Sequence, residues 1–505
     1  MHDFAALLSA KRFYSQDLRY NGELLSDITD SQSKENYRFH LTMQSESDRG
    51  RIINSAAVRR LQQKTQVFPL EKNAAVRSRL THSLEVMQVG RYITRKLLSE
   101  IAKHKVLRGY QSVGLDQIIE SLVEMSCLMH DIGNPPFGHF GEKAISDWFT
   151  VNLDTLIEDA LVSKGHERLP AELLDDLSQF EGNAQGIRLI TSLQKLNLTQ
   201  TQLATVLKYT RCGTEKKPAK THPLFYLQKK VGYYYSEKVL VDEIYATHKL
   251  AQGHRHPLTY IMEAADDISY CIADLEDAID KNILTIPQLC RLLEQEFDSK
   301  HPINNSVLEK ALNNHKSWYA YKEDSSDYSL FFIGLRTFFI NCMVNHAVRK
   351  FIANFDDIMT GKFSEHMLED DSQEWAMAES MKKVAFKYVF NHREVEANEL
   401  KGYTVITGLL GIYKPLLDVP EDIFSASLQG EKSAPLLLTR LCKKLPSKHV
   451  RAYKQAIATQ YPTLPLFESN HNKEFYFRCR LIQDFISGMT DQFALDEYRE
   501  LMAIN

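Results

Sequence analysis

The fold of this chain is decided by the stretch Cys127-Leu128-Met129-His130-Asp131-Ile132-Gly133-Asn134-Pro135-Pro136-Phe137-Gly138-His139. A hydrophobic helical run ends in the adjacent pair His130-Asp131, and a glycine and two prolines then stop the helix. Adjacent side chains on a helix point about 100° apart, but both can reach one ion where the helix stops. A neutral imidazole beside a carboxylate suits a borderline divalent metal such as manganese. The dipeptide alone is more often a capped helix end, so other segments must supply further ligands.

Length and composition are those of an ordinary folded globular protein. The 505 residues are enough for more than one hydrophobic core, and 44% of them are hydrophobic and 25% charged. The net charge of −4 gives no global electrostatic reason to bind nucleic acid. Basic clusters do occur at 216–220 and 443–444, but such clusters are usually solvated surface.

Cysteine usage and hydropathy predict a cytoplasmic protein that does not associate with a membrane. The seven cysteines are odd in number and form no CxxC, which argues against a disulfide framework and against a structural zinc site. The N-terminus has no basic segment followed by an apolar run, so no signal peptide is expected. The most apolar window, 330–344, is interrupted by Arg336 and Asn341 and is too short to span a bilayer.

Hydrophobic periodicity predicts an all-α fold. Strong helices are expected over 81–104, 117–132 and 258–282, and further helices over 48–66 and within 311–355. Helical patterns continue to the C-terminus, and no alternation of strands and helices occurs.

Composition along the chain suggests three regions. They are an N-terminal arm at 1–40, a helical core at 41–285 and a helical C-terminal region at 286–505. Within the core, 151–178 is acidic and is expected to form short helices. The segment 212–238 is rich in Lys, Pro and Tyr and is expected to form a long loop or lid.

Two of the strong helices carry ionisable residues on faces that are otherwise apolar. His82 lies four residues before Val86 and extends the buried stripe of its helix by one turn. In the third strong helix, Asp266, Tyr270 and Asp274 share one face at a spacing of four residues. Buried carboxylates cost free energy unless they are paired or bind a metal, so this face is a candidate metal site. A core histidine bonded to backbone and a solvated acidic face remain as alternatives.

The order of these residues resembles the H…HD…D signature of the HD-domain metal phosphohydrolases. The neighbouring segments are similar to the deoxynucleotide triphosphohydrolase branch, in particular to the bacterial deoxyguanosine triphosphate triphosphohydrolases, from about residue 48 to the C-terminus. These segments are Arg79-Leu80-Thr81-His82-Ser83, the opening stretch from His130, the helix around Asp266, Phe180-Glu181-Gly182-Asn183-Ala184-Gln185-Gly186, Leu207-Lys208-Tyr209 and Asp484-Phe485-Ile486-Ser487-Gly488-Met489-Thr490-Asp491. The N-terminal arm and 151–178 match poorly.

The resemblance implies a metal-dependent hydrolysis that controls dNTP pools. The implied ligands of one Mn²⁺ or Mg²⁺ per active site are His82, His130, Asp131 and Asp266. The family reaction cleaves a deoxynucleoside triphosphate, here dGTP, into the deoxynucleoside and intact tripolyphosphate by water attack at the α-phosphate. His139 and Glu142 resemble the family's catalytic dyad, with His139 as general base, general acid or transient nucleophile.

Phosphate contacts also follow from the resemblance. Arg79, Lys208, Tyr209 and Lys230 match the family's phosphate-binding positions. The planar guanidinium of an arginine suits a bidentate grip on phosphate, whereas a lysine acts as a point charge. Val231 departs from the proline expected beside the lysine.

The sugar and base contacts come from both halves of the chain. Gln66 matches a position that reads the 3′-hydroxyl, Tyr270 would stack under the sugar and Asp274 would accept a bond from the 3′-hydroxyl. The implied base-binding residues are Phe390, Glu399 for the guanine N–H donors and Arg440 for O6. An exposed glutamate and arginine on helices explain the last two equally well.

The resemblance further implies a homo-oligomer, hexameric or tetrameric, in which part of the base-recognition region reaches a neighbouring subunit. Single-stranded DNA is a possible effector. The alternatives are an HD phosphohydrolase acting on other dNTPs or on guanosine alarmones, and an oligomeric single-stranded nucleic-acid-binding protein. No Walker-type GxxxxGK occurs.

Overall fold

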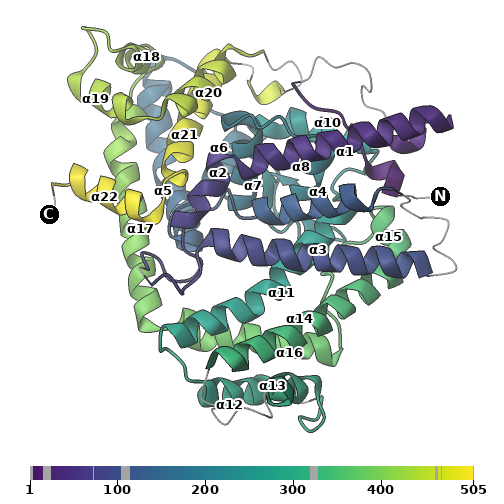
Figure 1. Cartoon of the computed structure of the whole chain (residues 1–505). Helices are drawn as coiled ribbons and strands as arrows, with labels where there is room; N and C mark the ends of the chain where they lie inside the picture. Colours follow the sequence, from purple (N-terminus) through teal and green to yellow (C-terminus); the bar gives the residue numbers. More distant parts are fainter. Residues whose placement is uncertain are drawn as a thin grey trace.

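The structure, a computed structural model, is mainly helical and describes residues 4–14, 24–71, 73–103, 114–298, 300–318, 328–460, 464–467 and 469–503 (Figure 1). Up to α11 the helices are η1 Phe4–Leu7, η2 Leu25–Asp27, α1 Ser31–Ile53, α2 Ala56–Arg60, η3 Leu61–Gln63, α3 Arg79–Lys103, α4 Asp116–Met129, α5 Gly138–Ala160, η5 Val162–Lys164, α6 Ala171–Ser178, α7 Gly182–Arg188, η6 Leu189–Leu193, α8 Gln200–Val206, α9 Phe225–Gln228, η7 Tyr235–Glu237, α10 Lys238–His248 and α11 Pro257–Asp280. They are followed by α12 Ile286–Glu296, α13 Val307–Trp318, α14 Tyr328–Ala353, α15 Phe355–Met359, α16 Gln373–Val384, η8 Ala385–Phe390, α17 Arg393–Tyr413, η9 Lys414–Leu416, α18 Glu421–Gln429, α19 Leu436–Lys444, α20 Ser447–Ala458, η10 Pro465–Phe467, α21 Asn470–Ser487 and α22 Asp491–Leu501. The short strands β1 (Arg211–Cys212) and β2 (Val231–Tyr233) pair in parallel. The all-α prediction is confirmed.

Helix α4 explains where the site forms, because it lies between two hydrophobic cores. Its residues Leu122 and Val123 belong to the core that also contains α3, α11 and α14. Its residues Leu128 and Met129 belong to the core built on α5, α17 and α21. All residues of α4 from Ser121 to Met129 are buried, as expected of a helix enclosed between two cores. His130 directly follows the last residue of α4 and therefore lies where the two cores meet.

The three strong helices were predicted within three residues of their ends, but the bounds predicted for the helix over 48–66 are wrong. The helix expected over 48–66 instead begins at Ser31, where Asp30 accepts a hydrogen bond from Ser33 N at 2.9 Å and caps it. It ends at Ile53, and Ser55 then caps the separate helix α2. The described part of the arm is also not purely polar surface, because 4–8 packs into the first core.

Two further expectations are corrected. The segment 151–178 begins as the last turns of the long helix α5, and only its later part forms short helices. The segment 212–238 is more ordered than a long loop, since it contains α9, β2 and the partner strand of that sheet.

Helix α14 contains the most apolar window of the sequence and continues to Ala353, beyond the predicted 330–344. Leu330–Ala353 is long and apolar enough to cross a membrane by length and composition. However, 56% of its most apolar window is buried inside the protein, where α14 packs against α3, α11 and α13. The apolar sequence is thus explained by packing in the core.

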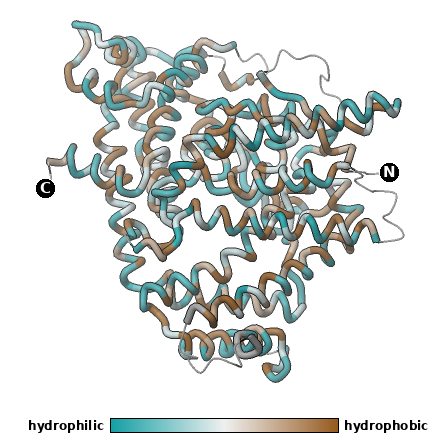
Figure 2. The backbone as a smooth tube through the Cα atoms, viewed as in Figure 1, coloured by the Kyte–Doolittle hydropathy of each residue, from teal (hydrophilic) through white to brown (hydrophobic). Residues whose placement is uncertain are grey.

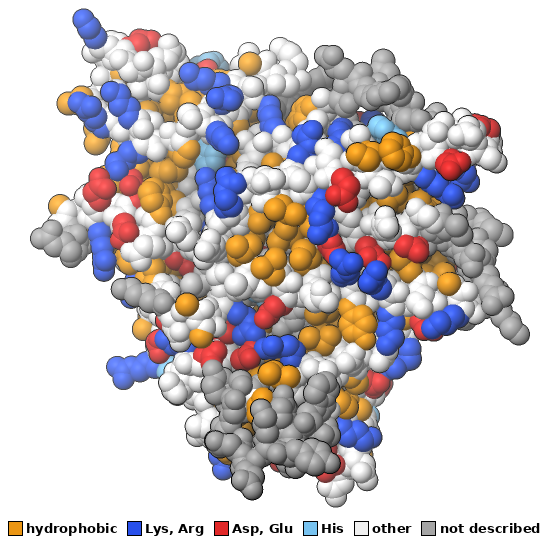
Figure 3. Space-filling view, viewed as in Figure 1, with side chains coloured by type: hydrophobic (Ala, Val, Ile, Leu, Met, Phe, Trp, Pro, Cys, Tyr) orange, Lys and Arg blue, Asp and Glu red, His pale blue; other side chains and the backbone are white. Residues whose placement is uncertain are grey.

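The surface of the molecule is amphipathic and mixed in charge. Figure 2 shows hydrophilic and hydrophobic residues alternating along the outer helices, which is the pattern of helices buried on one side. On the face shown in Figure 3, basic and acidic side chains are interspersed with hydrophobic ones. This mixture agrees with the small net charge of −4.

Candidate metal centre and substrate cavity

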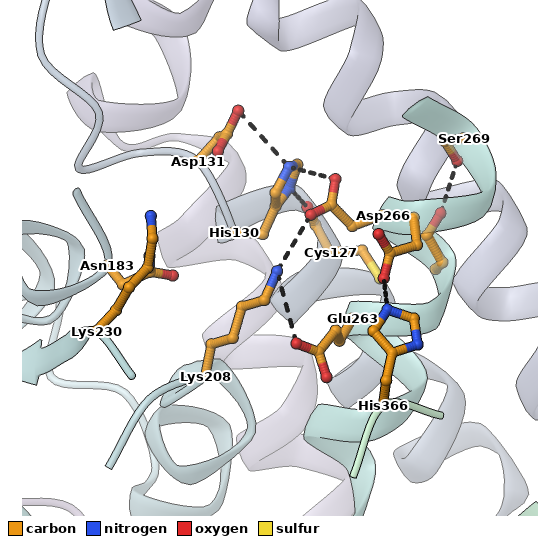
Figure 4. Close-up of polar contacts among 12 residues, drawn as sticks. Cys127, His130, Asp131, Asn183, Lys208, Lys230, Glu263, Asp266, Ser269 and His366 are labelled. Carbon is orange, nitrogen blue, oxygen red and sulfur yellow. Dashed lines mark hydrogen bonds and ion pairs between the residues drawn. The ribbon is translucent and has the colours of Figure 1, made fainter. Parts of the chain in front are cut away.

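Three side chains from three helices converge on one point. His82 of α3, His130 at the end of α4 and Asp266 of α11 offer ligand atoms that all lie within 4.8 Å of one another. The Nε2 atoms of His82 and His130 lie 3.3 and 3.4 Å from the same Asp266 oxygen, Oδ1. Figure 4 shows His130 and Asp266 turned toward each other.

The backbone fixes which nitrogen of His130 is free. Its Nδ1 lies 2.7 Å from the carbonyl oxygen of Cys127. A carbonyl can only accept, so Nδ1–H is the donor and the neutral ring keeps the Nε2 lone pair for a ligand. Such a backbone contact orients metal-binding histidines in general.

Asp131 lies beside this group but is held by other partners. Its Oδ2 is 3.7 Å from His130 Nε2 and accepts a hydrogen bond from Arg79 Nη1 at 2.5 Å. Its Oδ1 accepts from Asn134 Nδ2 at 2.7 Å. Burial opposes ionisation, but the nearby His130, when it is protonated, and the Arg79 guanidinium lower the pKa of Asp131 to about 2. The carboxylate is therefore ionised and oriented next to the three convergent ligands.

This donor set fits a divalent cation. Two imidazole nitrogens and two ionised carboxylates are the ligands that Mn²⁺ and similar borderline-to-hard metals accept. The ligand atoms of His82, His130 and Asp266, all within 4.8 Å of one another, have the spacing that atoms around one ion require. The residues support a divalent metal and do not distinguish one metal from another.

Lys208 brings a cation to the same centre. Its Nζ lies 3.4 Å from Asp266 Oδ2 and 4.0 Å from Glu263 Oε1, as drawn in Figure 4. Burial favours the neutral amine, but the charges of Asp266 and Glu263 raise the pKa of Lys208 above its usual value. The ammonium group is thus retained although it is largely enclosed.

His139 and Glu142 form a pair at the start of α5. The chain enters this helix through Phe137, whose φ is 63°, and Gly138, whose φ is 57°. His139 Nδ1 lies 3.0 Å from Glu142 Oε2, and this hydrogen bond raises the pKa of the imidazole. Glu142 Oε1 accepts in turn from Gly182 N at 2.8 Å. The His139 side chain is 79% exposed, so its other nitrogen is accessible.

Close backbone contact holds the loop after α4 against the start of α7. A Cβ added at Gly133 would lie 2.0 Å from Gly182 O and 2.2 Å from Gly186 N, so only glycine fits there. This contact brings the Gly182 amide to Glu142. The glycines in both segments therefore allow the two backbones to come into direct contact.

A cavity of about 870 Å³ joins these groups. The predicted site residues that line it are Gln66, Arg79, His130, Asp131, His139, Glu142, Lys208, Tyr209, Lys230, Asp266, Tyr270, Phe390 and Glu399. Three predicted residues lie outside the described lining. His82 is fully buried behind it, and Asp274 is buried next to Tyr270. Arg440 is exposed on α19, which packs against α18 and η9.

Several lining residues were not predicted to have a role. Glu181 Oε1 accepts hydrogen bonds from Lys230 Nζ at 3.1 Å and from Asn183 Nδ2 at 2.9 Å. Asn134 orients Asp131, and Asp267 lies next to the metal-site aspartate. The polar residues around Glu181 are the sequence signal that could have indicated the first of these, and Asn134 lies in the opening stretch directly after His130-Asp131.

The fold and the site define the class of protein, and comparison with known families agrees. The model of the HD domain matches residues 79–282, the part that carries His82, His130, Asp131 and Asp266. The expectation of an HD domain is thereby confirmed, and the core bounds 41–285 stay a prediction.

Relatives are similar along nearly the whole chain. The probable deoxyguanosinetriphosphate triphosphohydrolase of Pseudomonas aeruginosa is 49% identical over 472 residues, which cover 92% of this chain and 94% of the relative. The deoxyguanosinetriphosphate triphosphohydrolases of Yersinia pseudotuberculosis and Serratia proteamaculans are each 47% identical, with 92% of this chain and 95% of each relative covered. The chain belongs to the deoxyguanosinetriphosphate triphosphohydrolase family, which confirms the resemblance.

Proposed function

We propose that this protein hydrolyses dGTP to deoxyguanosine and inorganic tripolyphosphate and so controls the dNTP pool. The observation that carries the proposal is one cavity of about 870 Å³ that holds a divalent-metal ligand group, a His-Glu pair and three cationic side chains. Its volume lies within the range of small-molecule sites. Family membership supports the same substrate.

The proposed metal is one Mn²⁺ or Mg²⁺ held by His82, His130, Asp131 and Asp266. When bound, such an ion would polarise the α-phosphate and neutralise charge in the transition state. The chain's own contribution is to present two Nε2 atoms and an Asp266 oxygen from rigid helices. Arg79 supports the geometry because it holds the fourth proposed ligand, the carboxylate of Asp131, in place.

His139 is proposed to move the proton. Cleavage between the α-phosphorus and the 5′-oxygen removes a proton from water and requires one at the leaving oxygen. The accessible imidazole of His139 serves either step, and Glu142 holds the ring through Nδ1. Direct attack by His139 on the α-phosphorus, with the 5′-oxygen leaving, is the third role. It would leave tripolyphosphate bonded to the imidazole, and such an adduct trapped on rapid quenching would distinguish it.

The triphosphate is proposed to bind Arg79, Lys208, Tyr209 and Lys230. Their positions along the cavity support this, because a chain of phosphates needs cations at several points. Before substrate binds, carboxylates neutralise these cations, such as Glu181 at Lys230. Substrate phosphates would replace these internal partners.

The nucleoside is proposed to lie between the sugar residues and η8 with α17. Tyr270 and Phe390 support this, since their ring centroids are 6.1 Å apart at the border of the cavity. Gln66 would read the 3′-hydroxyl from the cavity wall, with Asp274 behind it as the second acceptor. Glu399 lines the same end and would accept from the guanine N–H donors.

We further propose a cytoplasmic homo-oligomer, a hexamer or tetramer, in which Arg440 reaches a neighbouring cavity and binds O6. Leu436 and Leu437, one turn before it, are 70% and 62% exposed, as side chains at an interface would be in a lone subunit. Sedimentation measures the assembly, and mixing Glu399→Ala with Arg440→Ala subunits should restore activity if the site is shared. Single-stranded DNA as effector is tested by adding an oligonucleotide to the assay.

The main experiment separates this function from its alternatives. The protein is incubated with Mn²⁺ or Mg²⁺ and each dNTP, NTP or guanosine tetraphosphate, and the products are separated by ion exchange. Deoxyguanosine with tripolyphosphate is expected. Release of orthophosphate or pyrophosphate, or turnover of alarmones alone, would overturn the proposal.

Two adjacent lysines provide a matched pair of variants. Lys230→Ala should raise KM for dGTP about tenfold or more, because it removes a charged contact to phosphate. Lys229 lies outside the described lining, and its Nζ is 4.2 Å from the Tyr226 ring centroid. Lys229→Ala should therefore leave KM nearly unchanged. Equal effects of the two variants would contradict the phosphate site.

A further inference from the structure

The segment from Asp484 to Asp491 near the C-terminus has a family-like sequence but lies outside the substrate cavity. It forms the end of α21, the turn after it and the first residue of α22. All its residues except Gly488 and Thr490 are buried. Its polar groups form hydrogen bonds to three other segments, which are α7, the residues Lys64 and Thr65, and the loop at Phe137.

The most informative contacts are those of the Asp491 carboxylate. Its Oδ1 accepts a hydrogen bond from Phe137 N at 3.0 Å. Its Oδ2 accepts from Thr65 N at 3.0 Å and from Thr65 Oγ1 at 2.6 Å. Asp491 is only 3% exposed, so these bonds are protected from water. A single buried carboxylate thus joins two segments that lie far apart in the sequence.

Both segments form walls of the cavity. Phe137 comes two residues before His139, the proposed proton carrier, and Thr65 comes directly before Gln66, the proposed sugar contact. Phe137 also needs external support, because a bulky side chain rarely adopts a φ of 63°. The bond to Asp491 holds its amide in that orientation.

The same C-terminal segment makes a second contact with the HD core, through the carbonyl oxygen of Ser487. Lys64 Nζ donates to the carbonyl oxygen of Ser487 at 2.9 Å and to that of Asn134 at 2.5 Å. Asn134 is the residue that orients Asp131. The loop between α4 and α5 is therefore fastened to the C-terminal helices at two points.

We propose that Asp491 is a positioning residue that sets His139 relative to the nucleoside wall of the cavity. It touches neither substrate nor metal ligands and acts through Phe137 and Thr65. The kinetic part of this inference rests on the proposed hydrolysis of dGTP. The part about loop position does not.

The test uses Asp491→Asn in the full-length protein loaded with Mn²⁺. The amide keeps the shape of the side chain, but its NH₂ group cannot accept a hydrogen bond. The variant therefore loses its hydrogen bond either to Phe137 N or to Thr65 N. Thr490→Ala is the matched control, since Thr490 caps α22 by accepting from Phe493 N at 3.4 Å and has no bond to either wall. Thr65→Val removes only the hydroxyl bond and tests one side of the tie.

Two measurements are made on each variant. Hydrogen exchange should accelerate in the peptides that contain Thr65 and Phe137 in Asp491→Asn but not in Thr490→Ala. kcat for dGTP should fall about tenfold or more in Asp491→Asn, because small displacements of a catalytic group cost large factors in rate. Mn²⁺ affinity should stay within about twofold of wild type, because no ligand contacts Asp491.

The outcomes are separable. Equal exchange in Asp491→Asn and Thr490→Ala would overturn the positioning role whatever the substrate is. Faster exchange with unchanged kcat in a wild-type-like enzyme would also overturn it. If the wild-type protein releases no tripolyphosphate from dGTP, the proposed function fails, and the exchange result still decides whether Asp491 holds the two walls.

Discussion

Gly402 offers a sharp test of how the C-terminal helices support the catalytic loop. It lies on α17, one turn after Glu399, and faces Phe137. A Cβ added there would lie 2.5 Å from Phe137 Cγ and 2.6 Å from its Cβ. Ordinary contact begins at 3.4 Å, so the two segments must separate by about 0.9 Å. Rotation of the ring alone cannot relieve a clash with the Cβ of Phe137.

The energetic effect of Gly402→Ala on folding is expected to be small. Replacing a glycine inside a helix by alanine stabilises the helix by roughly 1 kcal/mol. Overpacking typically costs about 1–3 kcal/mol. The free energy of unfolding should therefore fall by between zero and about 2 kcal/mol, which leaves a typical protein folded. Catalysis should suffer more, because a displacement near 1 Å can lower a rate about a hundredfold.

Gly411 on the same helix is the matched control. No atom of the described residues lies within 4 Å of a Cβ added there, so Gly411→Ala should gain helix stability and keep its activity. Steady-state release of deoxyguanosine from saturating dGTP gives kcat, and thermal denaturation gives stability. A Gly402→Ala enzyme with wild-type kcat would refute the idea that α17 sets the position of the loop.

Three further perturbations have defined outcomes. His130→Ala should abolish metal-dependent turnover and weaken Mn²⁺ binding in calorimetry while the protein stays folded, and unchanged affinity would exclude it as a ligand. Glu142→Gln should move the inflection of the kcat/KM pH profile that belongs to His139 to lower pH, because Glu142 raises the pKa of that imidazole; an unmoved inflection would show that the pair does not act in catalysis. His256 accepts from Leu258 N through Nδ1, and burial lowers its pKa from 6.5 to about 3. The unfolded chain therefore binds a proton that the folded chain does not, so stability is full above pH 6.5 and falls below it by up to about 1.4 kcal/mol per pH unit. His256→Asn, which keeps a capping acceptor, should flatten this slope in urea titrations at pH 4.5–7, and an identical slope would assign the acid sensitivity to other groups.

The helices that carry the metal ligands could be predicted because their sequences contain the physical cause of their folding. Apolar residues at helical spacing bury α3, α4 and α11 against one another. His82, His130 and Asp266 interrupt that apolar pattern, and buried polar groups cost free energy unless they are paired or bind a metal. The order of the ligands then resembled the HD-domain signature, and the neighbouring segments indicated the deoxynucleotide triphosphohydrolase branch. The hydrophobic periodicity of these three helices was therefore enough to predict where the centre of the site lies.

Boundaries set by single caps were harder to predict. The polar helix α1 has little apolar periodicity, and its start depends on one hydrogen bond from Ser33 N to Asp30. The break before α2 depends likewise on Ser55. A capping residue is common in any polar segment, so its position alone does not distinguish a helix start from a turn.

Contacts between distant segments could not be derived from the sequence at all. The bond between Phe137 and Asp491 joins residues 354 positions apart, and nothing at either position encodes the other. The internal partners of Asp131 and Lys230 are likewise set by the fold. The expected place of Arg440 in the base site depends on an assembly that a single chain does not contain.

These distant contacts also bear on how far the active unit extends beyond the HD core. Arg188 of α7 is buried and binds Asp484 through Nε at 2.8 Å and Nη2 at 2.7 Å, and Gln185 Nε2 donates to the same carboxylate at 2.9 Å. Removing one partner of a buried ion pair costs about 3–5 kcal/mol, comparable to a large share of the stability of a domain. Without α21 and α22, Phe137 N would also lose its acceptor, Asp491, at the entrance to the His139 turn. A fragment that ends at 285 would keep all four predicted metal ligands, yet it would lack the groups that hold α7 and the catalytic loop in place. We therefore expect the C-terminal helices to be required for activity, although the structure puts none of their described side chains on the proposed metal ligands.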